Sequence, residues 1–191
     1  GKPEVWYHFM TDAMVKAIDA DVGVHVSALS GDNYPVGSIT RRSIYNSNPR
    51  TFEFANEFGY NVYSSRVRGV FIGIIAKVAL RFGLPLYFSG LTFDYKKVGD
   101  SRYSHKYKIK NLRIHGKRIN PFKNYKVALS EAIVRGGLAI TPFVKLLLQY
   151  SDDYKIPMWK AIENRVREIG IIDDDYLNTR PPYDEANYVE L

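Results

Sequence analysis

The 191-residue sequence contains no cysteine, which excludes disulfide frameworks, thiolate metal sites and cysteine nucleophiles. It also lacks an apolar run long enough to span a bilayer, because the stretch from Val70 to Leu80 is interrupted by Gly73 and Lys77. The first residues show neither the basic nor the apolar region of a signal peptide. What remains is an ordinary globular composition in a chain long enough to bury its own core.

Signatures of the common catalytic centres are missing as well. The sequence has no glycine-rich phosphate loop and no Gly-x-Ser-x-Gly elbow. No two of its histidines, His8, His25, His105 and His115, stand at a metal-ligand spacing with a carboxylate between them. We expect His25 on the polar or sheet-packed face of a strand and the other three histidines at the surface. The acidic run at residues 173–175 is expected to be solvated.

Charge is distributed unevenly along the chain. The formal net charge is +7, yet residues 173–191 contain six acidic side chains and only Arg180 as a base. The rest of the chain therefore carries about +12. Such a basic body attracts phosphate esters, nucleic acids and acidic surfaces without selecting among them.

Hydrophobic periodicity predicts helices and strands that do not alternate in a regular order. Apolar residues at helical spacing predict helices over residues 4–20, 41–47, 70–82, 141–150 and 157–170. Alternating apolar residues predict strands near residues 22–26, 51–54, 60–67, 87–95, 103–115 and 125–129. This order predicts an α+β fold in which mixed, mainly antiparallel sheets are layered with helices. We expect one domain over residues 1–172, with an irregular acidic tail over residues 173–191 packed on it.

Local signals predict several details within these elements. Thr40 is expected to cap the second helix, and Glu163 and Arg167 to form an ion pair across one turn of the last. The helix over residues 70–82 is apolar almost all round, which predicts a position buried between layers. A phase slip near Asn111 predicts a β-bulge or a break in its strand.

Four segments stand in an order and spacing that chance explains poorly. They are Thr-Asp-Ala-Met at 11–14 with Ala-Asp-Val at 20–22, Pro-Val-Gly-Ser-Ile-Thr at 35–40, Ser-Gly-Leu at 89–91, and Ile-Asn-Pro-Phe-Lys-Asn-Tyr-Lys-Val-Ala at 119–128 followed by Gly136 and Gly137. Together, over roughly residues 5–141, they resemble the C-terminal domain of 5'-nucleotidases and UDP-sugar hydrolases.

That resemblance implies a division of labour between two domains. In this family an N-terminal metallophosphoesterase domain holds two metals and a His-Asp dyad, and the C-terminal domain grips the nucleoside or sugar. No Gly-Asn-His-Glu or Asp-x-His pattern occurs in this sequence. We therefore expect a substrate-binding domain of a hydrolase of nucleotide catabolism, with no cofactor of its own and no activity alone. Its expected partner is a metal-bearing domain, in cis or in trans, in the periplasm or another extracytoplasmic compartment.

Departures from the family pattern predict a changed ligand site. The family's Asn-Gly-Gly-Gly-Ile-Arg loop corresponds to residues 26–31, which contain no arginine. The two phenylalanines that sandwich a base in the family align near Arg50 and with residues 130–132, where no aromatic residue stands. Stacking contributes about 1–3 kcal/mol per aromatic contact, so we expect ordinary purine nucleotides to bind poorly.

Three hypotheses follow for the function. In the first, guanidinium groups replace stacking in a rebuilt anion pocket, whose candidate residues are Arg50, Arg135, Arg41, Arg42, Ser30, Gly31, Gly90, Gly136 and Gly137. Arginines in loops are more often solvated, and the three glycines beyond residue 31 more often serve backbone geometry. In the second hypothesis the domain has lost its ligand and serves as a structural or protein-interaction module. In the third, residues 96–126 bind nucleic acid through lysines and arginines interleaved with Tyr103, Tyr107, Phe122 and Tyr125.

Overall fold

The computed structural model describes residues 3–27, 30, 37–48, 59–81, 83, 86–101, 104–135, 151–173, 175–176 and 188–190. Its helices in this part are α1 (Pro3–Ile18), α2 (Arg41–Ser47), α3 (Gly69–Arg81), α4 (Glu131–Val134) and α6 (Met158–Ile169). The strands are β1 (Val22–Val26), β2 (Asn61–Arg68), β3 (Leu86–Ser89), β4 (Leu91–Ser101), β5 (Ser104–Ile114), β6 (Lys117–Arg118), β7 (Asn124–Ser130), β8 (Asp152–Pro157) and β9 (Tyr188–Glu190).

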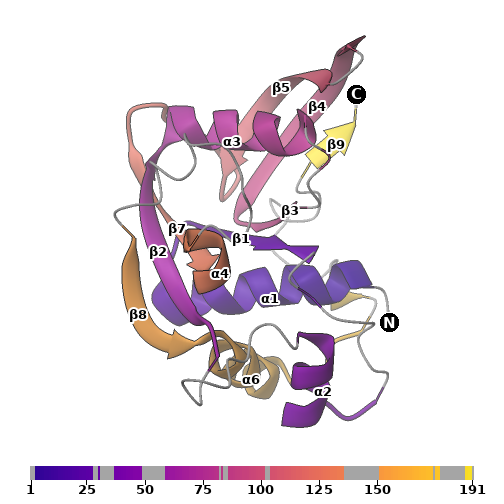
Figure 1. The fold of residues 1–191 in the computed structure, drawn as a ribbon, viewed down its shortest axis with the longest axis vertical. Helices are drawn as coiled ribbons and strands as arrows, with labels where there is room; N and C mark the ends of the chain where they lie inside the picture. Colours follow the sequence, from indigo (N-terminus) through magenta and orange to yellow (C-terminus); the bar gives the residue numbers. More distant parts are fainter. Residues whose placement is uncertain are drawn as a thin grey trace.

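The strands form two sheets. The first has the order β3-β1-β7-β2-β8, and β1 and β7 are its parallel pair. The second has the order β6-β5-β4-β9, in which β9 runs parallel to β4. Figure 1 shows α1 and α6 below the five-stranded sheet and α3 above it, beside the β4–β5 hairpin. The α+β fold class predicted from the sequence is thereby confirmed.

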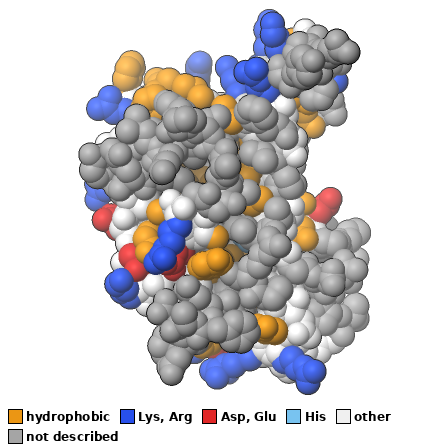
Figure 2. All heavy atoms as spheres, in the orientation of Figure 1, with side chains coloured by type: hydrophobic (Ala, Val, Ile, Leu, Met, Phe, Trp, Pro, Cys, Tyr) orange, Lys and Arg blue, Asp and Glu red, His pale blue; other side chains and the backbone are white. Residues whose placement is uncertain are grey.

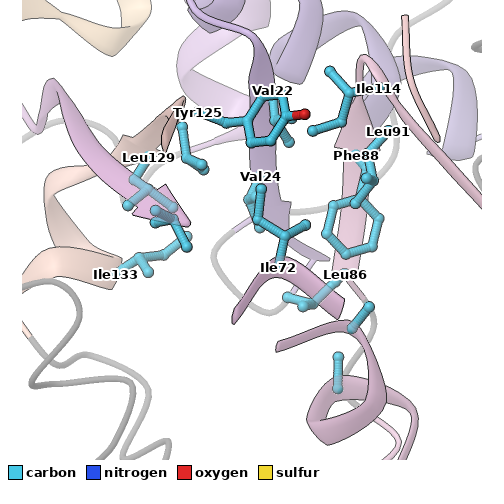
Figure 3. Packing of buried hydrophobic residues seen from close by; sticks show 14 of the residues in the cluster. Val22, Val24, Ile72, Leu86, Phe88, Leu91, Ile114, Tyr125, Leu129 and Ile133 are labelled. Atoms are coloured by element: carbon cyan, nitrogen blue, oxygen red, sulfur yellow. The ribbon is translucent and has the colours of Figure 1, made fainter. Parts of the chain in front are cut away.

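Two apolar cores lie on opposite faces of the five-stranded sheet. The upper core joins this sheet to α3 and the second sheet, and Val22 and Val24 point into it (Figure 3). The lower core joins the same sheet to α1 and α6. Strand β1 is therefore buried along its whole length, and His25, which alternates with the valines, is buried on the side of α1.

Several local predictions are confirmed. Thr40 caps α2 in a capping box with Ser43, and Glu163 pairs with Arg167 on α6. The register between β4 and β5 shifts between Thr92 and Asp94, which places an extra residue of β5 next to Asn111. Asn111 has φ 51°, as expected of a bulge residue.

Other predictions are wrong or only partly right. Helix α3 is not buried all round, because Val70 and Ile74 are exposed, and hydrophobic atoms over this helix are visible at the top of Figure 2. The tail is not irregular throughout, since its residues 188–190 form β9. His8 and His115 are half-buried, so their predicted surface positions hold only in part. Strand β8 was not predicted at all. The predicted strand at 51–54 and helix at 141–150 lie outside the described residues, as does the side chain of His105.

Candidate functional site

The parallel strands β1 and β7 end side by side, and the candidate site lies where they end. Val24 pairs with Leu129, so the next residues, His25 and Ser130, are neighbours on the same face. In open α/β sheets, ligands bind outside the carboxyl ends of parallel strands, and the corresponding edge of the β1–β7 pair is the candidate here. We call this region the β1–β7 end; it comprises His25, Ser30 and residues 130–135.

His25 is the most buried polar group of the β1–β7 end. Its ring is 0% exposed, and its Nε2 lies 2.8 Å from Ser30 Oγ. Its Nδ1 is buried and has no hydrogen-bond partner in the part of the chain that the structure describes. Burial lowers the pKa of His25 to about 3, so the imidazole is neutral at neutral pH. A neutral imidazole donates a hydrogen bond from one nitrogen and accepts one at the other. Among the described residues, only Nε2 of His25 has such a partner.

Ser30 connects this histidine to two helices. In the amide orientation that satisfies all its neighbours, Asn48 donates a 3.0 Å hydrogen bond to Ser30 Oγ and accepts a 2.8 Å hydrogen bond from Trp6 Nε1. Asn48 is the C-cap of α2, and Trp6 lies near the start of α1. Ser30 is thus linked to both helices by a largely buried chain of hydrogen-bonded polar groups.

The end of β7 presents a second polar group. Ser130 is buried at the N-cap of α4, where its side chain makes no capping bond, and its Oγ has no hydrogen-bond partner among the residues that the structure describes. Its neighbour Glu131 is also buried, accepts a 2.9 Å hydrogen bond from the backbone of Asn61, and pairs with Arg135. The guanidinium of Arg135 is therefore committed to a buried carboxylate, although 64% of its side chain is exposed.

Carboxylates of this region also change the pKa of a tyrosine on the adjoining strand β2. Burial, and then the negative charges of Glu131 and Asp153, raise the pKa of Tyr63. Arg135 therefore offsets local negative charge, and the described residues of the β1–β7 end carry no surplus of positive charge.

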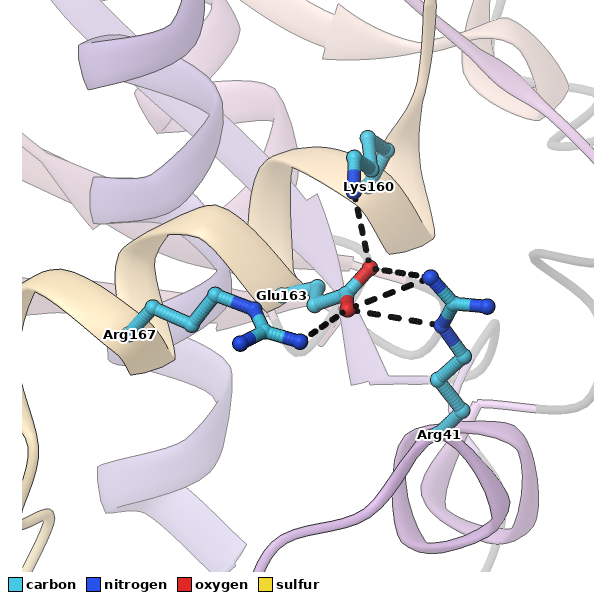
Figure 4. A network of polar contacts seen from close by, with 4 residues as sticks. All are labelled: Arg41, Lys160, Glu163 and Arg167. Carbon is cyan, nitrogen blue, oxygen red and sulfur yellow. Dashed lines mark hydrogen bonds and ion pairs between the residues drawn. The ribbon is translucent and has the colours of Figure 1, made fainter.

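Arg41 and Arg42 lie at the other end of α2, about 10 Å of helix away from Asn48. Figure 4 shows Arg41 next to Glu163 of α6, with the two closest atoms 3.3 Å apart. The same guanidinium lies over the ring of Trp159, 5.4 Å from its centroid. Arg41 thus joins α2 to α6, and Arg42 is exposed on α2. The structure does not bring either arginine to Ser30.

Gly90 lies at the opposite end of β1 from Ser30, because the β3–β1 pairing brings Ser89 next to Gly23. Its φ is +73°, and an added Cβ would collide with the backbone oxygen of Asp21. Close packing of backbone therefore explains this glycine.

The remaining candidates, Arg50, Gly31, Gly136 and Gly137, lie outside the described residues.

Comparison with known proteins identifies the fold and the family. Residues 3–145 match the family described as 5'-nucleotidase, C-terminal domain. The chain belongs to this family. No curated protein sequence matches it.

Solved structures share the fold of this 5'-nucleotidase C-terminal domain at low sequence identity. NAD nucleotidase from Haemophilus influenzae aligns with a TM-score of 0.71 and 13% identity, over 98% of this chain and 33% of that one. A 5'-nucleotidase precursor from Thermus thermophilus gives 0.66 and 14%, over 88% and 33%. The sulfate thiohydrolase SoxB from Thermus thermophilus gives 0.65 and 16%, over 98% and 32%. The chain thus spans about a third of the length of these proteins.

Within the part of this 5'-nucleotidase C-terminal domain that the structure describes, no group of three histidine, aspartate or glutamate residues is placed to hold a metal ion. No helix among these residues is long and apolar enough to cross a membrane. Sequence reasoning named Ser30 and Arg135 as candidate residues, and its candidates did not include His25, Asn48 and Ser130, which the structure places in the same region. The alternation of His25 with valines was the available signal, and only the pairing of β1 with β7 gives it meaning.

Proposed function

We propose that this chain is the substrate-binding domain of a 5'-nucleotidase-like phosphoesterase and holds a phosphorylated small molecule at the β1–β7 end. The observation that carries the proposal is a pair of buried polar atoms, His25 Nδ1 and Ser130 Oγ, that have no hydrogen-bond partner among the described residues and lie on adjacent parallel strands of a family fold. Buried polar atoms are rarely left without a partner, and an unpaired one calls for a specific reason. In this proposal a ligand group enters between the two strand ends, which are closed to solvent in the structure, and supplies the missing hydrogen-bond partner.

The chemistry of the β1–β7 end selects the neutral part of such a ligand. His25 is neutral, Ser30 and Ser130 are hydroxyls, and Arg135 is paired with Glu131. These groups suit the hydroxyls of a sugar or the edge of a base better than a phosphate. The phosphate of the substrate would then face outward, toward the domain that cleaves it. This assignment revises the first sequence hypothesis, because Arg41 and Arg135 are engaged with Glu163 and Glu131.

Hydrolysis in this proposal depends on a separate metallophosphoesterase domain, in cis or in trans. Two divalent metals there would generate the attacking nucleophile and stabilise the charge that develops on the phosphoryl group. The described residues of this chain contribute binding and orientation. The purified 191-residue chain is expected to release no phosphate from nucleotides in the presence of Mn²⁺ or Zn²⁺. Metal-dependent turnover free of contaminants would refute this division.

A thermal-shift screen tests ligand binding directly. Nucleoside monophosphates, nucleotide sugars and dinucleotides are compared with inorganic phosphate at equal ionic strength. A ligand present at about 100 times its Kd stabilises the folded chain by about 2.7 kcal/mol and raises its melting temperature. We expect a shift with a nucleoside-containing ligand and none with phosphate alone. Ser30→Ala should reduce that shift, and the matched change Ser38→Ala, at an exposed position, should preserve it.

One observation favours the second hypothesis, a domain that has lost its ligand. Where the family has an aromatic residue, this chain has Ser130, Glu131 and Ala132, and all three are buried by the chain's own contacts. A module that binds only another protein would show no shift with any small molecule in the screen. It would still form a complex with a metallophosphoesterase domain, which size-exclusion chromatography would detect.

A further inference from the structure

The second sheet has one face packed against the core and one face open to solvent. On the inner face, Tyr95 and Ile109 stand opposite each other and pack with Leu112 against the core. The ring of Tyr107 is tilted against that of Tyr95, with ring centroids 5.8 Å apart, and therefore also points inward. The aromatic residues of β4 and β5 that the structure describes are thus directed away from the open face.

The open face is strongly cationic. Lys96 stands opposite Lys108, and Arg113 stands opposite Arg118, so like charges face each other across two pairs of strands. Lys106 and Lys110 alternate with the inward residues of β5 and share the same face. All six side chains are exposed. We call this surface the lysine face; it comprises Lys96, Lys106, Lys108, Lys110, Arg113 and Arg118.

Among the side chains that the structure describes, one carboxylate, that of Asp94, stands directly opposite a residue of the lysine face. Asp94 stands opposite Lys110 and accepts a hydrogen bond from Asn111. None of the four lysines forms an ion pair with another residue in the described part of the chain. Like charges directly opposite each other destabilise a sheet, so an anionic surface that neutralises them would be bound favourably. Figure 2 shows Lys and Arg side chains gathered at the top right, over the β4–β5 hairpin that projects beyond α3 in Figure 1.

Exposed apolar residues at both ends of this sheet identify the kind of anion. Phe122, in the turn that follows the edge strand β6, is 85% exposed, and Val98, at a bulge of β4, is 46% exposed. An anionic membrane surface binds basic side chains electrostatically and also buries exposed apolar side chains. A nucleic acid binds the basic side chains, and it gains from apolar residues only where aromatic rings stack on its bases. The inward direction of Tyr95 and Tyr107 removes these two rings as stacking platforms, which leaves Phe122 as the exposed aromatic ring of this region among the described residues.

We propose that the lysine face is a docking surface for an anionic lipid membrane, with Phe122 inserting at its edge. A basic residue near such a surface contributes about 1 kcal/mol, and the contribution falls with ionic strength. The binding is peripheral and reversible. It is independent of the β1–β7 end, which lies on the other sheet.

Vesicle sedimentation of the 191-residue chain tests the proposal. Vesicles of phosphatidylcholine with about 30% phosphatidylserine are compared with pure phosphatidylcholine, at about 0.1 M and 0.5 M salt. We expect binding only to the anionic vesicles, and loss of that binding at the higher salt concentration.

K108Q/K110Q should weaken partitioning onto the vesicles about 30-fold, because each lysine contributes about 1 kcal/mol of binding free energy. F122S should weaken it several-fold at low salt without changing the salt dependence.

A matched variant separates the lysine face from net charge. K16Q/K155Q removes the same charge from α1 and β8 and should leave binding within about twofold of the parent chain. Circular dichroism and melting temperature verify that every variant is folded. Equal losses in the two double variants, absence of binding to anionic vesicles, or binding of duplex DNA without binding of vesicles would each overturn the proposal.

Discussion

Glu163 is the residue on which three cations converge, and it illustrates how a buried carboxylate is retained. Its side chain is 8% exposed, and the nearest atoms of Arg167, Lys160 and Arg41 lie at 2.9, 3.1 and 3.3 Å. Hydrogen bonds from Arg167 first, and then from Lys160 and Arg41, lower the pKa of Glu163 to about 2 against the opposing effect of burial. The network in Figure 4 therefore fixes α2 on α6.

Glu163→Gln should reduce stability by about 2 kcal/mol at pH 7, since the cations are largely exposed and solvent screens them. The folded-state pKa lies below the unfolded value of 4.5. The contribution is therefore complete above pH 4.5 and is lost as the pH falls toward 2. Urea unfolding at several pH values measures it. Glu168→Gln, at a more exposed ion pair, should change stability far less; equal effects of the two variants would contradict the role of burial.

Gly90 is a residue whose identity is imposed by backbone geometry. Gly90→Ala should destabilise the domain by about 3 kcal/mol or more, because it adds a collision with Asp21 to the cost of a left-handed conformation. Gly83→Ala is the control, since Gly83 has φ +59° but open space around it, and should cost about 1 kcal/mol. Guanidinium unfolding compares the two. Equal decreases in the free energy of unfolding for the two variants would show that the close approach of the Asp21 backbone to Gly90 adds nothing to the cost of the substitution.

At the scale of elements, the bulge at Asn111 sets the register of the second sheet. It brings Leu112 and Ile114 to the inner face and Arg113 to the open face. Asn111→Gly keeps access to the positive φ, whereas Asn111→Ala does not, and both lose the hydrogen bond to Asp94. Asn111→Gly should therefore be more stable than Asn111→Ala by about 1 kcal/mol. Thermal unfolding of both variants tests this, and a more stable alanine variant would contradict it.

Periodicity predicted the elements whose burial is one-sided or regular. Helices α1 and α6 and strands β2 and β7 follow their apolar patterns, and Thr40 marks the start of α2. Strand β8 escaped prediction because its residues are mostly polar and Lys155 has φ 53°. Strand β9 escaped because it lies in an acidic tail and is held by pairing with β4. Sheet pairing between distant segments is tertiary information that no local pattern contains.

At the scale of the whole molecule, the candidate site depends on the same kind of long-range pairing. Four motifs in order were enough to place the chain among 5'-nucleotidase C-terminal domains, and the family match confirms this. Those motifs also led to Ser30 in the loop after β1. They did not show that β1 and β7 are parallel neighbours, which unites His25 with Ser130. Nor did they show that Glu163 engages Arg41, since only the fold brings these two distant charges together.

The chain shares its fold with proteins of different names, and that fold alone does not identify its ligand. It aligns with about a third of each matched chain, and the fold is shared with both nucleotidases and a sulfate thiohydrolase. One fold therefore occurs in proteins with different substrates, and the ligand must be argued from the β1–β7 end itself. That end contains neutral hydrogen-bonding groups and no surplus of cations among the described residues.

The most direct test of ligand binding at the β1–β7 end is a ¹H–¹⁵N NMR titration of the chain with the best ligand of the thermal-shift screen. We predict that amide shifts change at Ser27, Ser30 and residues 130–135, and that the His25 ring signals move with them. Amides of the β4–β5 hairpin should stay unchanged and serve as the internal control. Changes confined to the hairpin, or no change with any nucleoside-containing ligand, would contradict the account.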